Sequence, residues 1–111
     1  MSDCIFCKII ARELPCNMIH EDDHVVIFTD INPKAKVHWL CVPKVHLNNL
    51  YDVSSEHQTL MSHMMCQLPK IATEKGIDSF RAIINNGENS GQEVGHLHMH
   101  LLSGEGRLPG F

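Results

Sequence analysis

The stretch His-Leu-His-Met-His-Leu-Leu at residues 96–102 carries three histidines that alternate with apolar residues. Successive side chains of a β-strand point to opposite faces, so the alternation predicts a strand with His96, His98 and His100 on one face and the apolar residues toward the core. Side chains two positions apart lie roughly 7 Å from each other. The imidazoles are therefore expected to converge on one phosphate-sized group or, in part, on a metal ion. A solvent-exposed strand face that happens to carry histidine is the alternative, and the strict alternation disfavours it.

A glycine-rich loop, Asn-Asn-Gly-Glu-Asn-Ser-Gly-Gln at residues 85–92, directly precedes the histidine segment. Glycine allows backbone angles that other residues avoid, and it lets backbone N–H groups approach an anion closely. The loop is therefore a candidate phosphate cradle beside the histidines.

The remaining pattern predicts an α+β domain. Val- and Ile-rich runs bounded by turn residues indicate strands, and apolar residues at helical spacing between residues 60 and 72 indicate a long helix that Pro69 is expected to kink or divide in two. We expect a mostly antiparallel five-stranded sheet, with the long helix on one face and a short N-terminal helix. The predicted strands are residues 18–20, 24–29, 37–43, 80–84 and 96–102, the helices fall within residues 1–12 and 54–76, and the tail 104–111 is irregular.

Composition narrows the possible partners. A chain of 111 residues forms one domain, residues 1–111, and 43% hydrophobic and 20% charged residues are ordinary for a globular protein. The net charge of −4 and the scattered Lys and Arg argue against nucleic-acid binding. The sequence lacks an apolar run long enough to span a membrane and an apolar signal region, so we expect a cytoplasmic protein.

Five cysteines in a reducing compartment are expected to be thiols or metal ligands rather than disulfides. Cys4 and Cys7 form a Cys-X-X-Cys element, which three interpretations fit: a structural zinc site, a thioredoxin-like redox pair, or two buried thiols. The redox pair normally follows a strand in a βαβ unit, which is missing here. A structural zinc site needs four ligands, so two cysteines need two further donors. His46 and His96 are the best candidates.

Other chemically suggestive residues are expected to be structural. Asp30 is ambiguous by itself because Asp is common at turns. Helical spacing predicts core packing for Met61, Met64 and Met65. Core positions are also predicted for Cys16, Cys41 and Cys66, and surface positions for His20, His24, His57 and His63.

The histidine segment matches the signature of the histidine triad (HIT) family, His-φ-His-φ-His-φ-φ with φ apolar. The resemblance extends over residues 4–10, 28–33, 38–40, 42–46 and 85–103, and it is closest to the Hint branch of nucleoside phosphoramidases. The branch that cleaves dinucleoside polyphosphates commonly carries Pro-Arg after the motif, which is absent here.

The resemblance implies catalytic roles for His98, His100, His38 and His96. His98 would attack the α-phosphorus and form a nucleotidyl-histidine, which water hydrolyses. His100, with His38 nearby, would bind phosphate oxygens. The phosphate cradle implied by the resemblance consists of Asn85 and the backbone around Gly91, Gln92, Glu93 and Val94.

The resemblance also implies a nucleoside site, a metal site and a homodimer. Asp30 would accept hydrogen bonds from both ribose hydroxyls, and Cys4, Cys7, His46 and His96 would bind a structural Zn²⁺ that catalysis itself does not need. The dimer would form through the long helix and a central strand. The slot for a purine base would be lined by Ile5, Phe6, Ile9, Phe28, Ile31 and Leu40.

The expected function is hydrolysis of purine nucleoside phosphoramidates, with release of the nucleoside monophosphate. The alternatives are a dinucleoside polyphosphate hydrolase and a non-catalytic protein that binds zinc and nucleotide.

Overall fold

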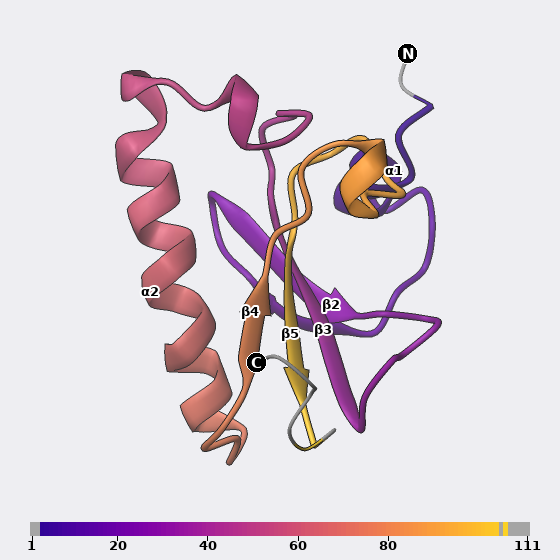
Figure 1. Cartoon of the computed structure of the whole chain (residues 1–111), viewed down its shortest axis with the longest axis vertical. Helices are drawn as coiled ribbons and strands as arrows, with labels where there is room; N and C mark the ends of the chain where they lie inside the picture. Colours follow the sequence, from indigo (N-terminus) through magenta and orange to yellow (C-terminus); the bar gives the residue numbers. More distant parts are fainter. Residues whose placement is uncertain (1–2, 105, 107–111) are drawn as a thin grey trace.

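The computed structural model describes residues 3–104 and 106. Within them the chain forms a five-stranded antiparallel sheet, one long helix and a short N-terminal helix, which confirms the predicted α+β architecture (Figure 1). Most of the predicted tail, residues 105 and 107–111, lies outside the described residues. The helices are α1 (Ile5–Ile10) and α2 (Gln58–Glu74), and the strands are β1 (Met18–Glu21), β2 (Val25–Thr29), β3 (Val37–Pro43), β4 (Arg81–Ile83) and β5 (Met99–Ser103).

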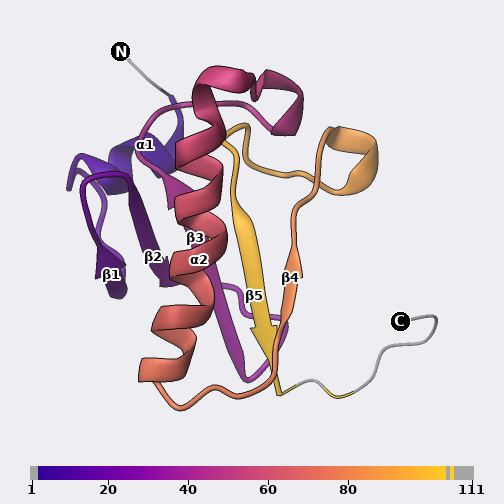
Figure 2. The ribbon, with the colours of Figure 1, turned by 90° about the vertical axis from the view of Figure 1, so that its left-hand side faces the viewer.

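The strands lie in the order β1-β2-β3-β5-β4, so β3 and β5 are central neighbours. Strand alternation gives the sheet two apolar faces. One face packs against α2, and the other packs against α1, as the two perpendicular views show (Figures 1 and 2). Leu40 pairs with His100, and His38 with Leu102. His38 and His100 therefore lie on the α1 face, where the candidate site forms.

Helix α2 is one continuous element that contains Pro69. The expectation that the proline divides the helix in two is therefore wrong. Pro69 and Met65, the residue four positions earlier, are both exposed. The carbonyl that Pro69 leaves without an amide partner can therefore be hydrated. Before the helix, the backbone N–H of Ser54 donates to His57 Nδ1, which is half of a capping box.

Two predicted core positions on α2 are wrong. Met64 is completely buried against the sheet, whereas Met65 is 56% exposed and Cys66 is exposed. The helix buries residues 64, 68, 71 and 72, and positions 65 and 66 lie outside that stripe. Cys41 is a buried core residue, as predicted.

Strand β5 begins at Met99, three residues later than predicted. In the preceding segment the N–H of His96 donates to Val94 O at 2.9 Å and the N–H of Leu97 donates to Leu47 O at 2.6 Å. These loop contacts replace strand pairing, so the first two histidines of the segment lie before the ladder.

None of the helices within residues 3–104 combines the length and apolar character needed to cross a membrane.

Candidate active site and metal centre

His98 has a fixed tautomer. Its Nδ1 lies 2.6 Å from the carbonyl oxygen of His96, and since a carbonyl only accepts, the ring proton is on Nδ1 and the lone pair is on Nε2. The Phe6 ring packs edge-on against the imidazole, with centroids 5.0 Å apart. His98 is therefore a buried imidazole whose unprotonated Nε2 is available as a nucleophile.

His38 and His100 form a second fixed pair. The backbone N–H of Lys34 donates to His38 Nδ1 at 3.0 Å, so the ring proton of His38 lies on Nε2. The Nε2–H of His38 donates to His100 Nδ1 at 2.9 Å. Asp30 Oδ2 lies 3.4 Å from the same His38 Nε2. His100 thus receives a hydrogen bond on Nδ1, which leaves its Nε2–H as a donor.

Burial keeps these imidazoles neutral. Desolvation lowers the pKa of His38, His96 and His98. Desolvation, with His98 and His38 adding to it, lowers the pKa of His100 to about 4. Neutral imidazoles at neutral pH suit both a nucleophile and a hydrogen-bond donor to phosphate.

His38, His98 and His100 line an open cavity of about 690 Å³ on the α1 face. It is large enough for a nucleotide-sized ligand. The structure places nearly all predicted nucleotide-binding residues in this lining: Ile5, Phe6, Ile9, Phe28, Asp30, Ile31, Leu40, Asn85, Gly91, Glu93 and Val94.

Two predicted site residues lie elsewhere. His96 is fully buried and does not belong to the described lining of the cavity. Gln92 is also outside it, because its side chain is used to hold loops together. Gln92 Oε1 accepts from the N–H of Gly87 at 2.8 Å, and Nε2 donates to the carbonyl oxygens of Asn48 at 2.6 Å and Val94 at 3.0 Å. Gln92 therefore shapes the glycine-rich loop without facing the cavity.

Asp30 lies in the cavity lining. Its Oδ1 accepts the N–H of Asn32 at 2.8 Å, which fixes the carboxylate at the turn after β2. A carboxylate oxygen accepts more than one hydrogen bond. Asp30 can therefore still receive hydroxyl donors from a ligand.

Sequence reasoning missed part of the cavity wall. Leu14, Pro15 and Cys16 line it beside the predicted apolar slot, and Lys34 contributes a cation. These residues follow α1 or lie in a turn, where no periodicity marks them. The short segment Leu-Pro-Cys at residues 14–16, which follows the charged pair Arg12 and Glu13, was the available signal.

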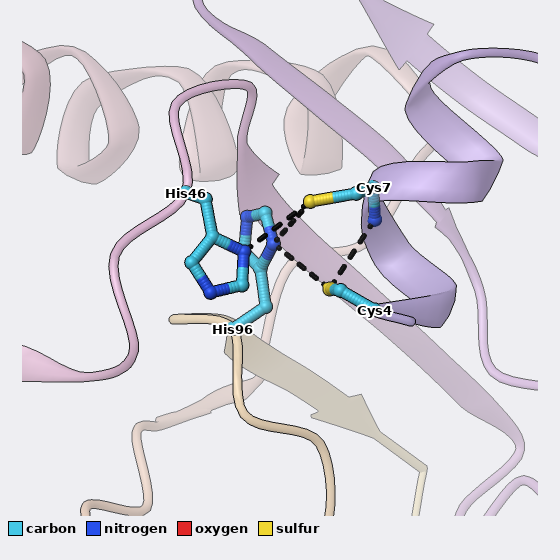
Figure 3. A group of neighbouring side chains, drawn as sticks. All are labelled: Cys4, Cys7, His46 and His96. Carbon is cyan, nitrogen blue, oxygen red and sulfur yellow. Dashed lines mark hydrogen bonds between the residues drawn. The ribbon is translucent and has the colours of Figure 1, made fainter. Parts of the chain in front are cut away.

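A second cluster lies outside the cavity and consists of Cys4, Cys7, His46 and His96 (Figure 3). Cys4 caps α1 and Cys7 lies within it, while His46 follows β3 and His96 precedes β5. One ligand atom from each lies within 4.8 Å of every other. We refer to these four residues as the Cys/His cluster.

Both imidazoles of the Cys/His cluster present Nδ1 to sulfur. His96 Nδ1 lies 3.3 Å from Cys4 Sγ and 3.5 Å from Cys7 Sγ, and His46 Nδ1 lies 3.2 Å from Cys7 Sγ. The other ring nitrogen of His96 donates to Pro43 O at 2.8 Å, and that of His46 donates to Asn48 Oδ1 at 3.2 Å. Each Nδ1 therefore carries a lone pair toward the centre.

The Cys/His cluster fits a tetrahedral metal ion. Zinc–sulfur and zinc–nitrogen bond lengths place the sulfur and nitrogen ligands of one ion roughly 3.6 Å apart, close to the separations observed. Two sulfur and two nitrogen donors are a ligand set that structural zinc prefers. Asp30, His38 and His100 also bring ligand atoms within 4.8 Å of one another. In that group, however, His38 Nε2 carries a proton and His100 Nδ1 accepts it, so neither nitrogen offers a lone pair to a metal ion.

A third group contradicts a sequence expectation. His20 and His63, predicted to be isolated surface residues, each place Nε2 2.8 Å from Asp22 Oδ2. Burial alone would raise the pKa of Asp22, but hydrogen bonds from both histidines and from the backbone N–H groups of His24 and Val25 outweigh it and hold the pKa well below its usual range. This group joins the β1–β2 turn to α2.

Comparison with known protein families identifies a match over residues 3–110 to the family described as "Scavenger mRNA decapping enzyme C-term binding", a HIT-like family. Among curated proteins, the chain is 48% identical over 103 residues to Protein HitA of Neisseria gonorrhoeae, covering 92% of this chain and 96% of that protein. It is 44% identical over 102 residues to the purine nucleoside phosphoramidase of Escherichia coli, covering 90% and 86%.

Solved structures agree with these relatives. A HIT family hydrolase from Clostridium thermocellum superposes with a TM-score of 0.93 at 40% identity, covering 98% of this chain and 96% of that one. A histidine triad protein from Clostridium difficile gives a TM-score of 0.92 at 46% identity, covering 100% and 97%.

Proposed function

Because this chain belongs to the histidine triad family, we propose that it hydrolyses purine nucleoside phosphoramidates and releases the nucleoside monophosphate. The observation that carries the proposal is the arrangement of His98. Its Nδ1–H is held by the His96 carbonyl, its Nε2 lone pair is free, and the ring lines a nucleotide-sized cavity. The similarity to a protein named purine nucleoside phosphoramidase supports the choice of substrate.

The reaction follows from this arrangement in two steps. In the first, His98 Nε2 attacks the α-phosphorus, a bond forms between that nitrogen and phosphorus, and the P–N bond to the amine breaks. The amine leaves with a proton taken up from solvent. In the second, water attacks the phosphorus and gives up a proton to solvent, the bond between phosphorus and His98 breaks, and the neutral imidazole is regenerated with release of the nucleoside monophosphate.

Neighbouring groups would stabilise the charge that develops during these steps. The His96 carbonyl faces the Nδ1–H of His98, whose ring becomes cationic when Nε2 is bonded to phosphorus. His100, fixed by His38, offers its Nε2–H to a phosphate oxygen. Because phosphoryl transfer depends mainly on positioning and electrostatics, these two contacts are expected to supply much of the rate.

The nucleoside would occupy the rest of the cavity. We assign Asp30 to the ribose hydroxyls and the apolar slot around Phe6, Phe28 and Leu40 to the purine base. An apolar slot binds the base by burial rather than by reading its edge, so adenine and guanine are both expected to fit.

We further propose that the Cys/His cluster binds one structural Zn²⁺. The ligand set, the separations of its atoms and the fixed tautomers of His46 and His96 support this assignment. A bound zinc ion would cross-link α1 to the loops after β3 and before β5, which a small domain can use for stability.

A homodimer in the cytoplasm completes the proposal. The exposed Met65 on α2 and the strand β4, which ends the strand order within the described residues, are the surfaces that a second copy would contact. No disulfide joins two cysteines in the part of the chain that the structure describes, which fits a reducing compartment.

The test is a side-by-side assay of an adenosine phosphoramidate with the wild-type protein, His98→Asn and the exposed control His24→Asn. We expect release of AMP by the wild type and by the control, and a rate lower by roughly 10³-fold or more in His98→Asn. No turnover by the wild type would contradict the proposal. Faster cleavage of a dinucleoside polyphosphate than of the phosphoramidate would favour the polyphosphate hydrolase.

A further inference from the structure

His96 belongs to two networks at once, one through its side chain and the other through its backbone. The side chain is fully buried in the Cys/His cluster, whereas the carbonyl oxygen accepts the ring proton of His98. We infer that the Cys/His cluster positions the nucleophile: its integrity holds the His96 carbonyl where it keeps the His98 proton on Nδ1. This inference rests on the proposed function, because it assigns a role in that reaction to residues that do not touch the substrate.

The His96 ring is fixed on both sides. Its Nε2–H donates to Pro43 O at 2.8 Å, and its Nδ1 lies between the sulfur atoms of Cys4 and Cys7. A side chain held at both ring nitrogens restricts the backbone that carries it. The direction of the His96 carbonyl therefore depends on contacts that lie outside the cavity.

Strand pairing cannot supply this restraint. The ladder between β3 and β5 begins with Cys41 opposite Met99, one residue after His98. Before that point the backbone is held by the N–H of His96 on Val94 O and the N–H of Leu97 on Leu47 O. The Cys/His cluster thus anchors a segment that the sheet does not.

A second connection runs from the same cluster to the glycine-rich loop. His46 donates to Asn48 Oδ1 at 3.2 Å, and the carbonyl oxygen of Asn48 accepts from Gln92 Nε2 at 2.6 Å. Gln92 in turn binds Val94 O and the N–H of Gly87. The cluster therefore restrains both the nucleophile and the loop beside it.

The physical consequence concerns the tautomer of His98. The His96 carbonyl is the hydrogen-bond acceptor that keeps the proton on Nδ1. If that carbonyl turns away, the proton can move to Nε2, and the nitrogen that should attack phosphorus no longer has a lone pair. The rate constant kcat is therefore expected to fall. Because α1 also carries Phe6 of the base slot, the tautomer of His98, rather than KM, is the readout that identifies the positioning role.

The experiment measures the tautomer directly, by ¹⁵N NMR of protein labelled at the histidine ring nitrogens. Protonated and unprotonated ring nitrogens have different ¹⁵N shifts, and His98→Asn assigns the His98 signals. The samples are the zinc-loaded wild type, the wild type stripped by a chelator, Cys7→Ser, and the matched control Cys66→Ser, whose cysteine is exposed on α2. Steady-state kcat and KM for an adenosine phosphoramidate are measured on the same samples.

We expect a single Nδ1–H signature for His98 in the zinc-loaded wild type and in Cys66→Ser. Chelation and Cys7→Ser should shift it toward a mixture of tautomers and lower kcat by about 10- to 100-fold. An unchanged His98 signature and an unchanged kcat after loss of the metal, in protein that circular dichroism shows to be folded, would overturn the positioning role.

Two further outcomes remain informative. If Cys7→Ser does not fold, His46→Asn carries the same test, because His46 is the exposed ligand and its removal leaves both thiols and His96 in place. If the wild type does not hydrolyse the phosphoramidate, the proposed function is wrong. The ring ¹⁵N signature then decides by itself whether the cluster controls the His98 tautomer.

Discussion

His96 and His98 are separated by one residue, yet they carry their ring protons on different nitrogens. His96 donates from Nε2 to Pro43 O, whereas His98 donates from Nδ1 to His96 O. The first therefore offers Nδ1 to two sulfur atoms, and the second keeps Nε2 for the cavity. The comparison shows that a nearby backbone carbonyl decides what each histidine can do.

The surroundings of the two residues also differ, since His96 lies in a closed cluster and His98 lines an open cavity. Around His96 the donor atoms converge within 4.8 Å of one another, which suits one small cation. Around His98 the lining opens into a cavity of about 690 Å³, which suits a nucleotide-sized ligand. One alternating motif thus serves a closed centre and an open one.

The largest expected effect comes from removing the residue that both regions share. His96→Asn should abolish zinc binding, expected at about one ion per chain, and lower the free energy of unfolding by about 3 kcal/mol or more. Metal analysis and urea unfolding check this, with His24→Asn as the control. A variant that is as stable as the wild type and still loads zinc would contradict the division between the two regions.

Asp30→Asn should weaken substrate binding in the cavity without affecting the Cys/His cluster. An amide replaces the charged acceptor assigned to the ribose hydroxyls, so kcat/KM for the ribonucleotide substrate should fall by about 10- to 100-fold. The wild type should also discriminate against a 2′-deoxy substrate, and the variant should lose most of that discrimination. Equal rates for both sugars in the wild type would argue against this role.

Asp22→Asn tests the third histidine group, in which a carboxylate rather than a carbonyl is the acceptor. The pKa of Asp22 is lowered in the folded protein, so its stabilising effect is present above the unfolded pKa near 3.8 and is lost as the pH falls through the folded value. At pH 7 we expect a loss of about 1–2 kcal/mol, measured by urea unfolding, with turnover of folded protein unchanged. A loss that does not shrink as the pH falls below 3.8 would have another cause.

The smallest expected effect is the pH dependence of kcat/KM near neutrality. Desolvation lowers the pKa of His98, so the neutral nucleophile persists below the ordinary histidine value of about 6.5. The profile should be flat from pH 8 to about 6.5 and decline only at lower pH. An acid limb with an apparent pKa above 6.5, after subtraction of uncatalysed P–N hydrolysis, would mean that the reactive ring is not buried as described.

The fold followed from the sequence because alternation and helical spacing are local signals. Strand β3 has the predicted bounds, 37–43, and α2 falls within the predicted range. Bounds that depend on distant contacts were not predictable. The late start of β5 results from the bond between Leu97 and Leu47, fifty residues apart, which no local pattern encodes.

The same distinction applies to the site. The Cys/His cluster was predicted because its donors have characteristic chemistry, and the structure brings the four together. The resemblance implied a place for the backbone around Gln92 in the phosphate cradle, but no local pattern showed that the Gln92 side chain binds Gly87, Asn48 and Val94. The shared acceptor of His20 and His63 also escaped prediction, because it depends on how α2 packs beside the β1–β2 turn.

The most direct test is to find which histidine becomes covalently bound to phosphorus. Wild-type protein is mixed rapidly with an adenosine phosphoramidate, quenched in alkali to preserve the P–N bond to the enzyme, and mapped by mass spectrometry after proteolysis. We predict an adenylyl group on His98 in the wild type and none in His98→Asn. An adenylyl group on His96 or His100, or turnover without any adduct on His98, would contradict the assignment of the nucleophile.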